Sequence, residues 1–239
     1  MPFRIRWLSH LITVAIGFLS WVFFRILNRT TIIGKENIVR RKRLLIVSNH
    51  VTLIDSFLVG CNLFFPVAAI KPWLPPFHLP DEQNFFHGAL FAGKLRLLGK
   101  IIPPFAGFLF AHLKCIPVKR GRKDFGALLK ASSVLEQGTV HIFPEGTRTR
   151  DGKLGRGREG VGYLISRTQP VVLPVYIEGM ENVMPVGCKI PKIGKRITII
   201  VGRPFTCTDV PGDPKSRDTW QLITQKVMGE IAALAPCAN

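Results

Sequence analysis

Short apolar segments of strand character, separated by stretches with helical periodicity, are the feature that most restricts how this chain can fold. Residues 44–47 and 139–143 are rich in β-branched side chains and have the length of strands. Ahead of the second segment, residues 124–137 place apolar side chains at helical spacing, and Asp124 is a suitable N-cap. Alternation of this kind is typical of an α/β protein. We therefore predict a mixed β-sheet surrounded by helices.

The rest of the chain fits one domain with a short appendage. Its 239 residues can enclose one sizeable core, and no internal repeat or low-complexity linker divides them. Residues 196–201 predict a further strand. An amphipathic helix is predicted over residues 217–234, where packing is a sufficient reason for the apolar face.

His50 and Asp55 are the first candidate functional residues. On a regular helix five positions turn through roughly 500°, so the two side chains would point to different faces. They can meet if His50 ends the strand at 44–47 and Asp55 enters the first turn of the next helix. The imidazole would then be a general base, and the carboxylate would fix its tautomer and stabilise the imidazolium. The simpler alternative is a loop histidine followed by an acid at a helix N-terminus.

The second candidate is the loop of residues 143–148, Phe-Pro-Glu-Gly-Thr-Arg. It leaves the strand at 139–143 at its carboxyl end, which is where ligands bind in open α/β sheets. Arg148 is a bidentate donor for phosphate, and Gly146 lets the backbone approach a ligand closely. Glu145 can position an arginine or accept a hydrogen bond from a substrate hydroxyl. The alternative is an ordinary solvated turn.

Both segments resemble motifs of the glycerolipid acyltransferase family, the group that includes the 1-acylglycerol-3-phosphate acyltransferases. His50 and Asp55 match its HxxxxD motif, and residues 143–148 match its FPEGTR motif. Residues 114–120, Lys-Cys-Ile-Pro-Val-Lys-Arg, are similar to the second motif of the family, which ends in an arginine that contacts phosphate. Residues 171–177 are similar to the fourth, an apolar strand that carries a proline beside the site.

The resemblance implies a glycerol-3-phosphate acyltransferase-like fold and a definite reaction. An acyl group would pass from an acyl thioester to the sn-2 hydroxyl of 1-acyl-sn-glycerol 3-phosphate (lysophosphatidate), which gives phosphatidate for phospholipid biosynthesis. His50 and Asp55 would be catalytic. The remaining site residues are those expected to bind the acceptor or its phosphate, namely Lys119, Arg120, Glu145, Gly146, Thr147 and Arg148, and those expected to shape the site, namely Asn49, Pro144 and Pro174.

Acyl-CoA or acyl carrier protein is the expected donor, because a thioester is reactive without a bound cofactor or metal. No serine or cysteine stands in a nucleophile motif, so we expect no covalent acyl-enzyme. The five cysteines are scattered, odd in number and free of CxxC pairs. They indicate neither a disulfide framework nor a metal site.

Some features depart from the family pattern. Arg120 follows Pro-Val-Lys instead of Phe-Ile-Asp, and Cys-Ile-Pro-Val at residues 115–118 is closer to the tafazzin-like transacylases. The stretch of residues 71–113 is longer than in compact members, which suggests a membrane-dipping or partner-specific insertion. Other acceptors therefore stay open, among them another lysophospholipid, a lyso-ornithine lipid or glycerol 3-phosphate, and so does transacylation without coenzyme A.

The charge of the chain points to an anionic partner. Thirty-three Lys and Arg against fifteen Asp and Glu give a net charge of +18. Such a surface attracts phospholipid headgroups, nucleic acid or an acidic carrier protein. RNP, KH and helix-turn-helix sequences are absent, so nucleic acid is not expected. A basic membrane-surface or nucleic-acid-binding module without catalysis is the alternative from another class, and it leaves the His50–Asp55 pair unexplained.

Residues 7–24 have no charged side chain in 18 positions, and tryptophans lie near both ends. This length is at the lower limit for a membrane span. Polar residues interrupt the segment, so an interfacial or re-entrant helix is the alternative. A signal peptide is a competing interpretation, but no small-x-small cleavage site follows. We therefore expect a membrane-associated helical segment at residues 1–30 and an acyltransferase domain at residues 31–239, on the cytoplasmic face of a membrane (the inner membrane in a bacterium).

Overall fold

The computed structural model describes residues 3–81, 108–110, 112–119, 124–149, 154–185, 187–188 and 190–236. The principal helices within these residues are α1 (Phe3–Trp21), α2 (Asp55–Phe64), α3 (Val67–Ile70), α6 (Phe125–Leu135), α7 (Glu159–Thr168), α8 (Met180–Val183) and α9 (Arg217–Ala232). A π-helix, η1 (Val22–Leu27), continues α1, and η2 (Lys35–Asn37) is a 3-10 helix. The strands are β1 (Arg29–Ile33), β2 (Leu44–Ser48), β3 (Phe77–His78), β4 (Thr139–Ile142), β5 (Val171–Glu178) and β6 (Arg196–Val201).

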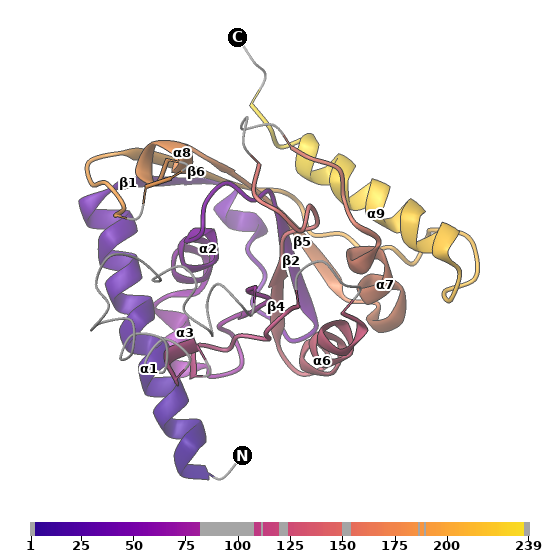
Figure 1. Cartoon of the computed structure of the whole chain (residues 1–239), viewed down its shortest axis with the longest axis horizontal. Helices are drawn as coiled ribbons and strands as arrows, with labels where there is room; N and C mark the ends of the chain where they lie inside the picture. Colours follow the sequence, from indigo (N-terminus) through magenta and orange to yellow (C-terminus); the bar gives the residue numbers. More distant parts are fainter. Residues whose placement is uncertain are drawn as a thin grey trace.

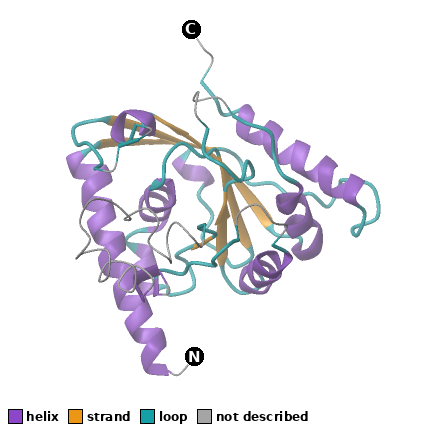
Figure 2. Ribbon diagram, in the orientation of Figure 1, coloured by secondary structure: helices purple, strands orange, loops and turns teal. Residues whose placement is uncertain are grey.

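The described strands form one sheet in the order β1-β6-β5-β2-β4-β3. Figure 2 shows the strands in orange. Strand β1 is parallel to β6, and β5, β2, β4 and β3 are parallel to their neighbours in that order. The contact between β5 and β6 is antiparallel. The predicted mixed sheet surrounded by helices is therefore confirmed.

Strand β2 lies inside the sheet and is buried on both faces. Leu44 and Ile46 belong to one apolar core, which includes side chains of α2 and α3. Leu45 and Val47 belong to a second core, which includes side chains of α6, α7 and α9. Figure 1 shows these two groups of helices on opposite faces of the sheet. Because neighbouring strand residues point to opposite faces, this double burial explains the unbroken apolar sequence of β2.

Most of the elements expected from the sequence are present. Strands β2, β4, β5 and β6 occupy the predicted segments, and α9 ends two residues before the predicted limit at 234. Helix α6 starts after Asp124, whose Oδ1 accepts a hydrogen bond from the backbone N–H of Ala127 at 3.0 Å, which confirms the predicted N-cap. Residues 82–107, the larger part of the suggested insertion at 71–113, lie outside the described residues.

Pro174 lies in the interior of β5 without interrupting the sheet. Its carbonyl accepts a hydrogen bond from the backbone N–H of Gly202 at 2.9 Å. In a strand the N–H and C=O of one residue point to the same neighbour, so the N–H that proline lacks would face the same side. On that side the pairing with β6 ends at Val201, and the chain returns to β5 at the bridge between Phe205 and Val172. The proline stands where this pairing ends, so the N–H that it lacks falls at the end of the ladder.

Helix α1 packs along the body of the protein through its polar residues. His10 Nε2 lies 2.9 Å from the carbonyl oxygen of Ala69, to which it donates, and Thr13 Oγ1 donates to the carbonyl of His112 at 3.3 Å. The opposite face is apolar and exposed, with Trp7, Leu8, Leu11, Phe18 and Leu19 at helical spacing. The polar interruptions noted in the sequence therefore face the protein.

Residues 7–27 form one helix, across α1 and η1, that is long and apolar enough to cross a membrane by length and composition. The same stretch contributes to the domain, since Phe24 of η1 is buried in the first core. The boundary expected between residues 30 and 31 falls inside β1, the strand that pairs with β6.

Candidate active site

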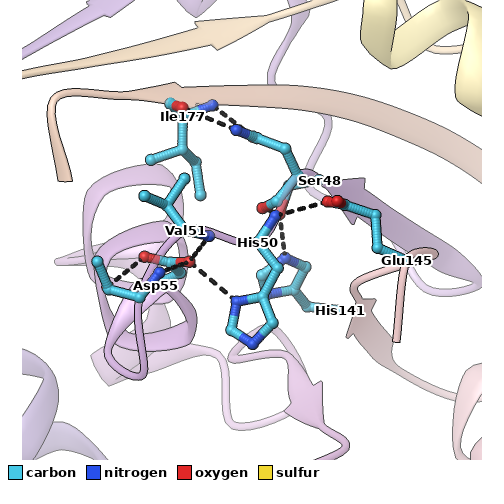
Figure 3. A network of polar contacts seen from close by, with 9 residues as sticks. Ser48, His50, Val51, Asp55, His141, Glu145 and Ile177 are labelled. Atoms are coloured by element: carbon cyan, nitrogen blue, oxygen red, sulfur yellow. Dashed lines mark hydrogen bonds and ion pairs between the residues drawn. The ribbon is translucent and has the colours of Figure 1, made fainter. Parts of the chain in front are cut away.

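The bend between β2 and α2 brings His50 and Asp55 together. Strand β2 ends at Ser48 and α2 starts at Asp55. In the connecting loop His50 Nδ1 lies 3.0 Å from Asp55 Oδ2 (Figure 3). The two residues meet across a strand–loop–helix bend, as their spacing requires.

The Asp55 carboxylate is fully buried and is held by other donors besides the imidazole. Oδ2 also accepts hydrogen bonds from the backbone N–H groups of Val51 and Thr52, both at 2.7 Å. Oδ1 accepts from the hydroxyl of Thr52 at 2.5 Å. A carboxylate that accepts from all of these groups takes the proton of His50 Nδ1 as a further donor. This arrangement leaves the lone pair of His50 on Nε2.

The ring of His50 lies flat against Phe143, the first residue after β4. The two ring centroids are 3.8 Å apart and the planes differ by 12°. The His50 side chain keeps 18% of its surface exposed, whereas Asp55 keeps none. Within the described residues Nε2 of His50 has no hydrogen-bond partner, so this atom is available to a substrate proton.

Glu145 connects the two predicted motifs. Its Oε1 accepts a hydrogen bond from the backbone N–H of His50 at 3.0 Å, and its Oε2 accepts from the backbone N–H of Gly155 at 2.8 Å. Burial raises the pKa of this carboxyl, and the two N–H donors act against the increase. A third link joins the loops, because the N–H of Thr149 donates to the carbonyl of His50 at 2.9 Å. Glu145 therefore positions the backbone of His50.

Gly146 is required by the shape of this loop. Its φ of +67° lies in the left-handed region that favours glycine. A Cβ at this position would lie 2.8 Å from the Cδ and Nε atoms of Arg158. Arg158 in turn donates from Nε to the carbonyl of Glu145 at 3.1 Å. The glycine and the arginine together hold the turn that carries Glu145.

Asn49 fastens the His50 loop to β5. Its side-chain amide donates to the carbonyl of Ile177 at 2.8 Å, and its side-chain oxygen accepts from the N–H of the same residue at 2.7 Å (Figure 3). Asn49 is buried, so both bonds are shielded from water. Its role in shaping a substrate site stays a prediction.

A buried histidine supports the same loop and was not expected from the sequence. His141 Nε2 lies 2.9 Å from Ser48 Oγ, and this hydroxyl donates to the carbonyl of Asn49 at 3.1 Å. His141 Nε2 therefore carries the proton and donates to Ser48. The ring also meets Phe143 edge to face at 4.7 Å between centroids. The available signal was the spacing of His141 and Phe143, since side chains two apart on a strand share a face.

A second histidine, His78, contacts the ring of His141. The rings of His78 and His141 meet edge to face at 5.4 Å between centroids. Burial lowers the pKa of His78 to about 3, with a further contribution from the charge of Lys114. The pKa of His141 is also well below the ordinary value, first because of burial and then because of the neighbouring histidines. Both rings are therefore neutral at physiological pH.

The other predicted site residues differ in how far they are buried. Pro144 is buried within the loop, and Thr147 and Arg148 are exposed beyond it. Arg148 takes part in no ion pair within the described residues. Lys119 is exposed, and its backbone N–H donates to Asp124 Oδ2 at 3.0 Å. Arg120 lies outside the described residues.

A cavity of about 70 Å³ opens between α1 and α2. Its walls include Thr13 and Gly17 of α1 and Ser56 and Gly60 of α2, and His78 lies among its lining residues. Ser56 follows Asp55 directly in the sequence. Most of the remaining wall is apolar, so the cavity fits hydrocarbon better than a charged group.

Comparison with known proteins places this geometry in context. A family model described as "Acyltransferase" matches residues 89–178, which include the loop at 143–148. Tafazzin from Drosophila melanogaster is 28% identical over 262 aligned positions, which cover 95% of this chain and 64% of that protein. The chloroplastic 1-acyl-sn-glycerol-3-phosphate acyltransferase LPAT1 from Arabidopsis thaliana is 27% identical over 140 positions, which cover 55% of this chain and 39% of that protein. The chain thus spans less than two thirds of either relative.

A solved structure has a similar fold. The 1-acyl-sn-glycerophosphate (LPA) acyltransferase PlsC from Thermotoga maritima superposes with a TM-score of 0.59 and 21% identity, over 93% of this chain and 80% of that one. The family match and the sequence relatives support a glycerolipid acyltransferase, and the solved structure shows that the fold is similar.

Proposed function

We propose that the protein is an O-acyltransferase that transfers an acyl group from an acyl thioester to the sn-2 hydroxyl of 1-acyl-sn-glycerol 3-phosphate. The observation that carries this proposal is the His50–Asp55 pair, with Nδ1 bound to a buried carboxylate at 3.0 Å and Nε2 free of partners in the described part of the chain. A base held in this way suits removal of a proton from a hydroxyl.

The reaction follows from the position of the free nitrogen. Nε2 of His50 takes the hydroxyl proton while the acceptor oxygen attacks the carbonyl carbon of the thioester. The tetrahedral intermediate then breaks its carbon–sulfur bond, and the leaving sulfur receives the proton from Nε2. The negative charge of Asp55 stabilises the imidazolium between these two steps. Phe143 keeps the ring in one plane throughout.

Arg148 is the proposed ligand of the acceptor phosphate. It is exposed, takes part in no ion pair within the described residues, and directly precedes Thr149, whose N–H bonds to His50. A guanidinium group binds a terminal phosphate through two parallel hydrogen bonds. Lys119, Arg120 and Thr147 stay predicted contributors to the same subsite.

The cavity between α1 and α2 is the proposed place for part of an acyl chain. Ser56, which follows Asp55 in the sequence, is one of its lining residues, and its walls are largely apolar. One wall is α1, whose outer face exposes Trp7, Leu11 and Leu19. We propose that this face lies in the surface of a membrane, on its cytoplasmic side, so that lipid substrates reach the cavity without crossing water.

A coenzyme-independent transacylase is the second candidate. Its support is the similarity to Drosophila melanogaster tafazzin, which extends over 95% of this chain. The sequence of residues 115–118, Cys-Ile-Pro-Val, also resembles that group. In this case a phospholipid would supply the acyl group, and His50 would activate the hydroxyl of a lysophospholipid in the same way.

One experiment separates the two candidates. Purified protein is given acyl-CoA or acyl carrier protein with a panel of lysolipids, and thiol release and acylated product are measured together. The same acceptors are then supplied with a phospholipid donor and no thioester. The first proposal requires thiol release with lysophosphatidate as the preferred acceptor. Product that forms only from the phospholipid donor would establish the transacylase instead.

A further inference from the structure

The loop between α8 and β6 exposes large apolar side chains among basic ones. Ile190 keeps 81% of its surface exposed and Ile193 keeps 61%. Lys192, Lys195 and Arg196 alternate with them, and no acidic residue occurs between positions 182 and 208. We call residues 190–196 the basic loop. Isolated exposed isoleucines are common, but two beside three positive charges form a patch of mixed character.

The basic loop is fastened to the end of the N-terminal helix. The backbone N–H of Gly194 donates to the carbonyl of Leu27 at 2.8 Å, and the N–H of Arg29 donates to the carbonyl of Lys195 at 2.8 Å. The buried side chain of Asn28 accepts from the N–H of Lys195 at 2.9 Å. The loop therefore has a fixed position beside η1, as Figure 1 shows at the upper end of α1.

Exposed apolar side chains lie on both sides of this junction. Ile26 and Leu27 keep 62% and 47% of their surface exposed at the end of η1. They extend the stripe that Leu11, Phe18 and Leu19 form on α1. Because Leu27 is bonded to Gly194, the loop that carries the two isoleucines lies beside the end of this stripe.

In the part of the chain that the structure describes, the charges at this junction lack anionic partners. Arg29 of β1 and Arg196 of β6 are neighbours in the sheet register, and both are exposed. Like charges placed side by side across two strands destabilise a sheet. None of Arg29, Lys192, Lys195 and Arg196 forms an ion pair within the described residues. An external anion bound here would relieve the repulsion between the two arginines.

We propose that the basic loop is a second membrane contact, in which Ile190 and Ile193 enter an anionic bilayer and the neighbouring lysines and arginines bind lipid phosphates. Isoleucines favour the acyl boundary, and basic side chains beside them favour anionic headgroups. The α1 stripe and the basic loop then touch one membrane surface at two points. This fixes the rotation of the domain about α1, which a single helix leaves free.

The test measures vesicle binding without turnover. Ile190→Ser combined with Ile193→Ser should weaken sedimentation with equimolar phosphatidylcholine and phosphatidylglycerol vesicles by about tenfold or more, since two exposed side chains lose their apolar contact. The control is Leu222→Ser, which removes an apolar side chain that is 45% exposed on α9. This control should bind as the unaltered protein does. Equal binding by the loop variant would overturn the proposal.

A charge variant and a label test the same contact independently. Lys192→Glu should weaken binding to the anionic vesicles several-fold and leave binding to pure phosphatidylcholine almost unchanged. Lys130→Glu, an exposed lysine on α6, is the control for charge and should have a smaller effect. A polarity-sensitive fluorophore on Cys188, which is exposed two residues before Ile190, should shift to shorter wavelength on anionic vesicles, with Cys237→Ser as background. An unshifted label, or a loop variant that changes only the oligomeric state, would show that the surface serves another purpose.

Discussion

Replacement of Asp55 by two different residues should separate the structural and the catalytic roles of its carboxylate. Asp55→Ala removes the acceptor of the backbone N–H groups of Val51 and Thr52, of the Thr52 hydroxyl and of His50. A buried donor left without a partner costs about 1–3 kcal/mol. Because two of these donors are backbone groups that cannot move away, we expect unfolding to become easier by about 3 kcal/mol. For a chain of this size the melting temperature would fall by roughly 6–12 °C.

Asp55→Asn should behave differently. Its amide oxygen can take the place of Oδ2 and keep the bonds to His50, Val51 and Thr52, while its NH₂ group meets the Thr52 hydroxyl, which can also accept. The melting temperature should therefore stay close to that of the unaltered protein. The negative charge is lost, however, and a charged acceptor contributes about 1.5–3 kcal/mol where a neutral one contributes about 0.5–1.5 kcal/mol.

The loss of transition-state stabilisation should be larger than this difference between a charged and a neutral acceptor. The imidazolium forms only during the reaction, and it then lies beside a carboxylate that is shielded from water. We expect kcat to fall by about 10² or more. Thiol release from acyl-CoA with detergent-dispersed lysophosphatidate measures the rate, and circular dichroism measures the melting temperature. An asparagine variant with a rate within a few-fold of the unaltered enzyme would refute the role of the charge. An alanine variant with an unchanged melting temperature would refute the structural one.

Three further predictions concern the loop, the acceptor and the buried histidines. Gly146→Ala should lower the free energy of unfolding by about 2 kcal/mol, because a left-handed φ costs about 1–2 kcal/mol and the new Cβ displaces Arg158. Gly229→Ala is the control, since a Cβ at this position on α9 meets open space, and it should not lower that free energy. Urea denaturation measures both. Arg148→Ala should raise KM for lysophosphatidate by about tenfold or more but matter less for a choline lysolipid, and Arg148→Lys should restore only part of the loss in initial-rate assays. Because the pKa of His78 is lowered to about 3 while the unfolded value is near 6.5, its neutral form stabilises the protein above pH 6.5, and this stability is lost as the pH falls towards 3. Denaturation curves at pH 7 and 5 should thus show a loss of stability that His78→Phe reduces.

The sequence was sufficient for those parts of the site that depend on neighbouring residues. The apolar β2, the helix that starts at Asp55 and the N-cap Asp124 are local features, and each has a sequence signature. The approach of His50 to Asp55 also followed from a short loop between a strand and a helix. Glu145 was expected to act on a substrate or an arginine. In the structure both of its oxygens bind backbone N–H groups, and its role towards a substrate stays a prediction.

The remaining parts depend on which strands become neighbours. His141 supports Ser48 because β4 pairs with β2, and His78 reaches His141 because β3 pairs with β4. The spacing of residues in a single sequence does not reveal the order of the strands in the sheet. Polar residues of α1 appeared to interrupt a membrane helix, yet His10 and others bond to residues more than fifty positions away. Contacts of this kind become visible only when the whole chain is folded.

The most direct test of the proposed chemistry is the rate of thiol release by His50→Ala under single-turnover conditions. The variant should release thiol about 10²–10⁴ times more slowly than the unaltered enzyme, because the general base is lost while the rest of the site remains. Its melting temperature and vesicle binding should be nearly unchanged, and His10→Gln, which alters a histidine of α1 that bonds to Ala69, should keep an almost normal rate. Thiol release by His50→Ala at a rate close to that of the unaltered enzyme would contradict the assignment of His50 as the base that activates the acceptor hydroxyl.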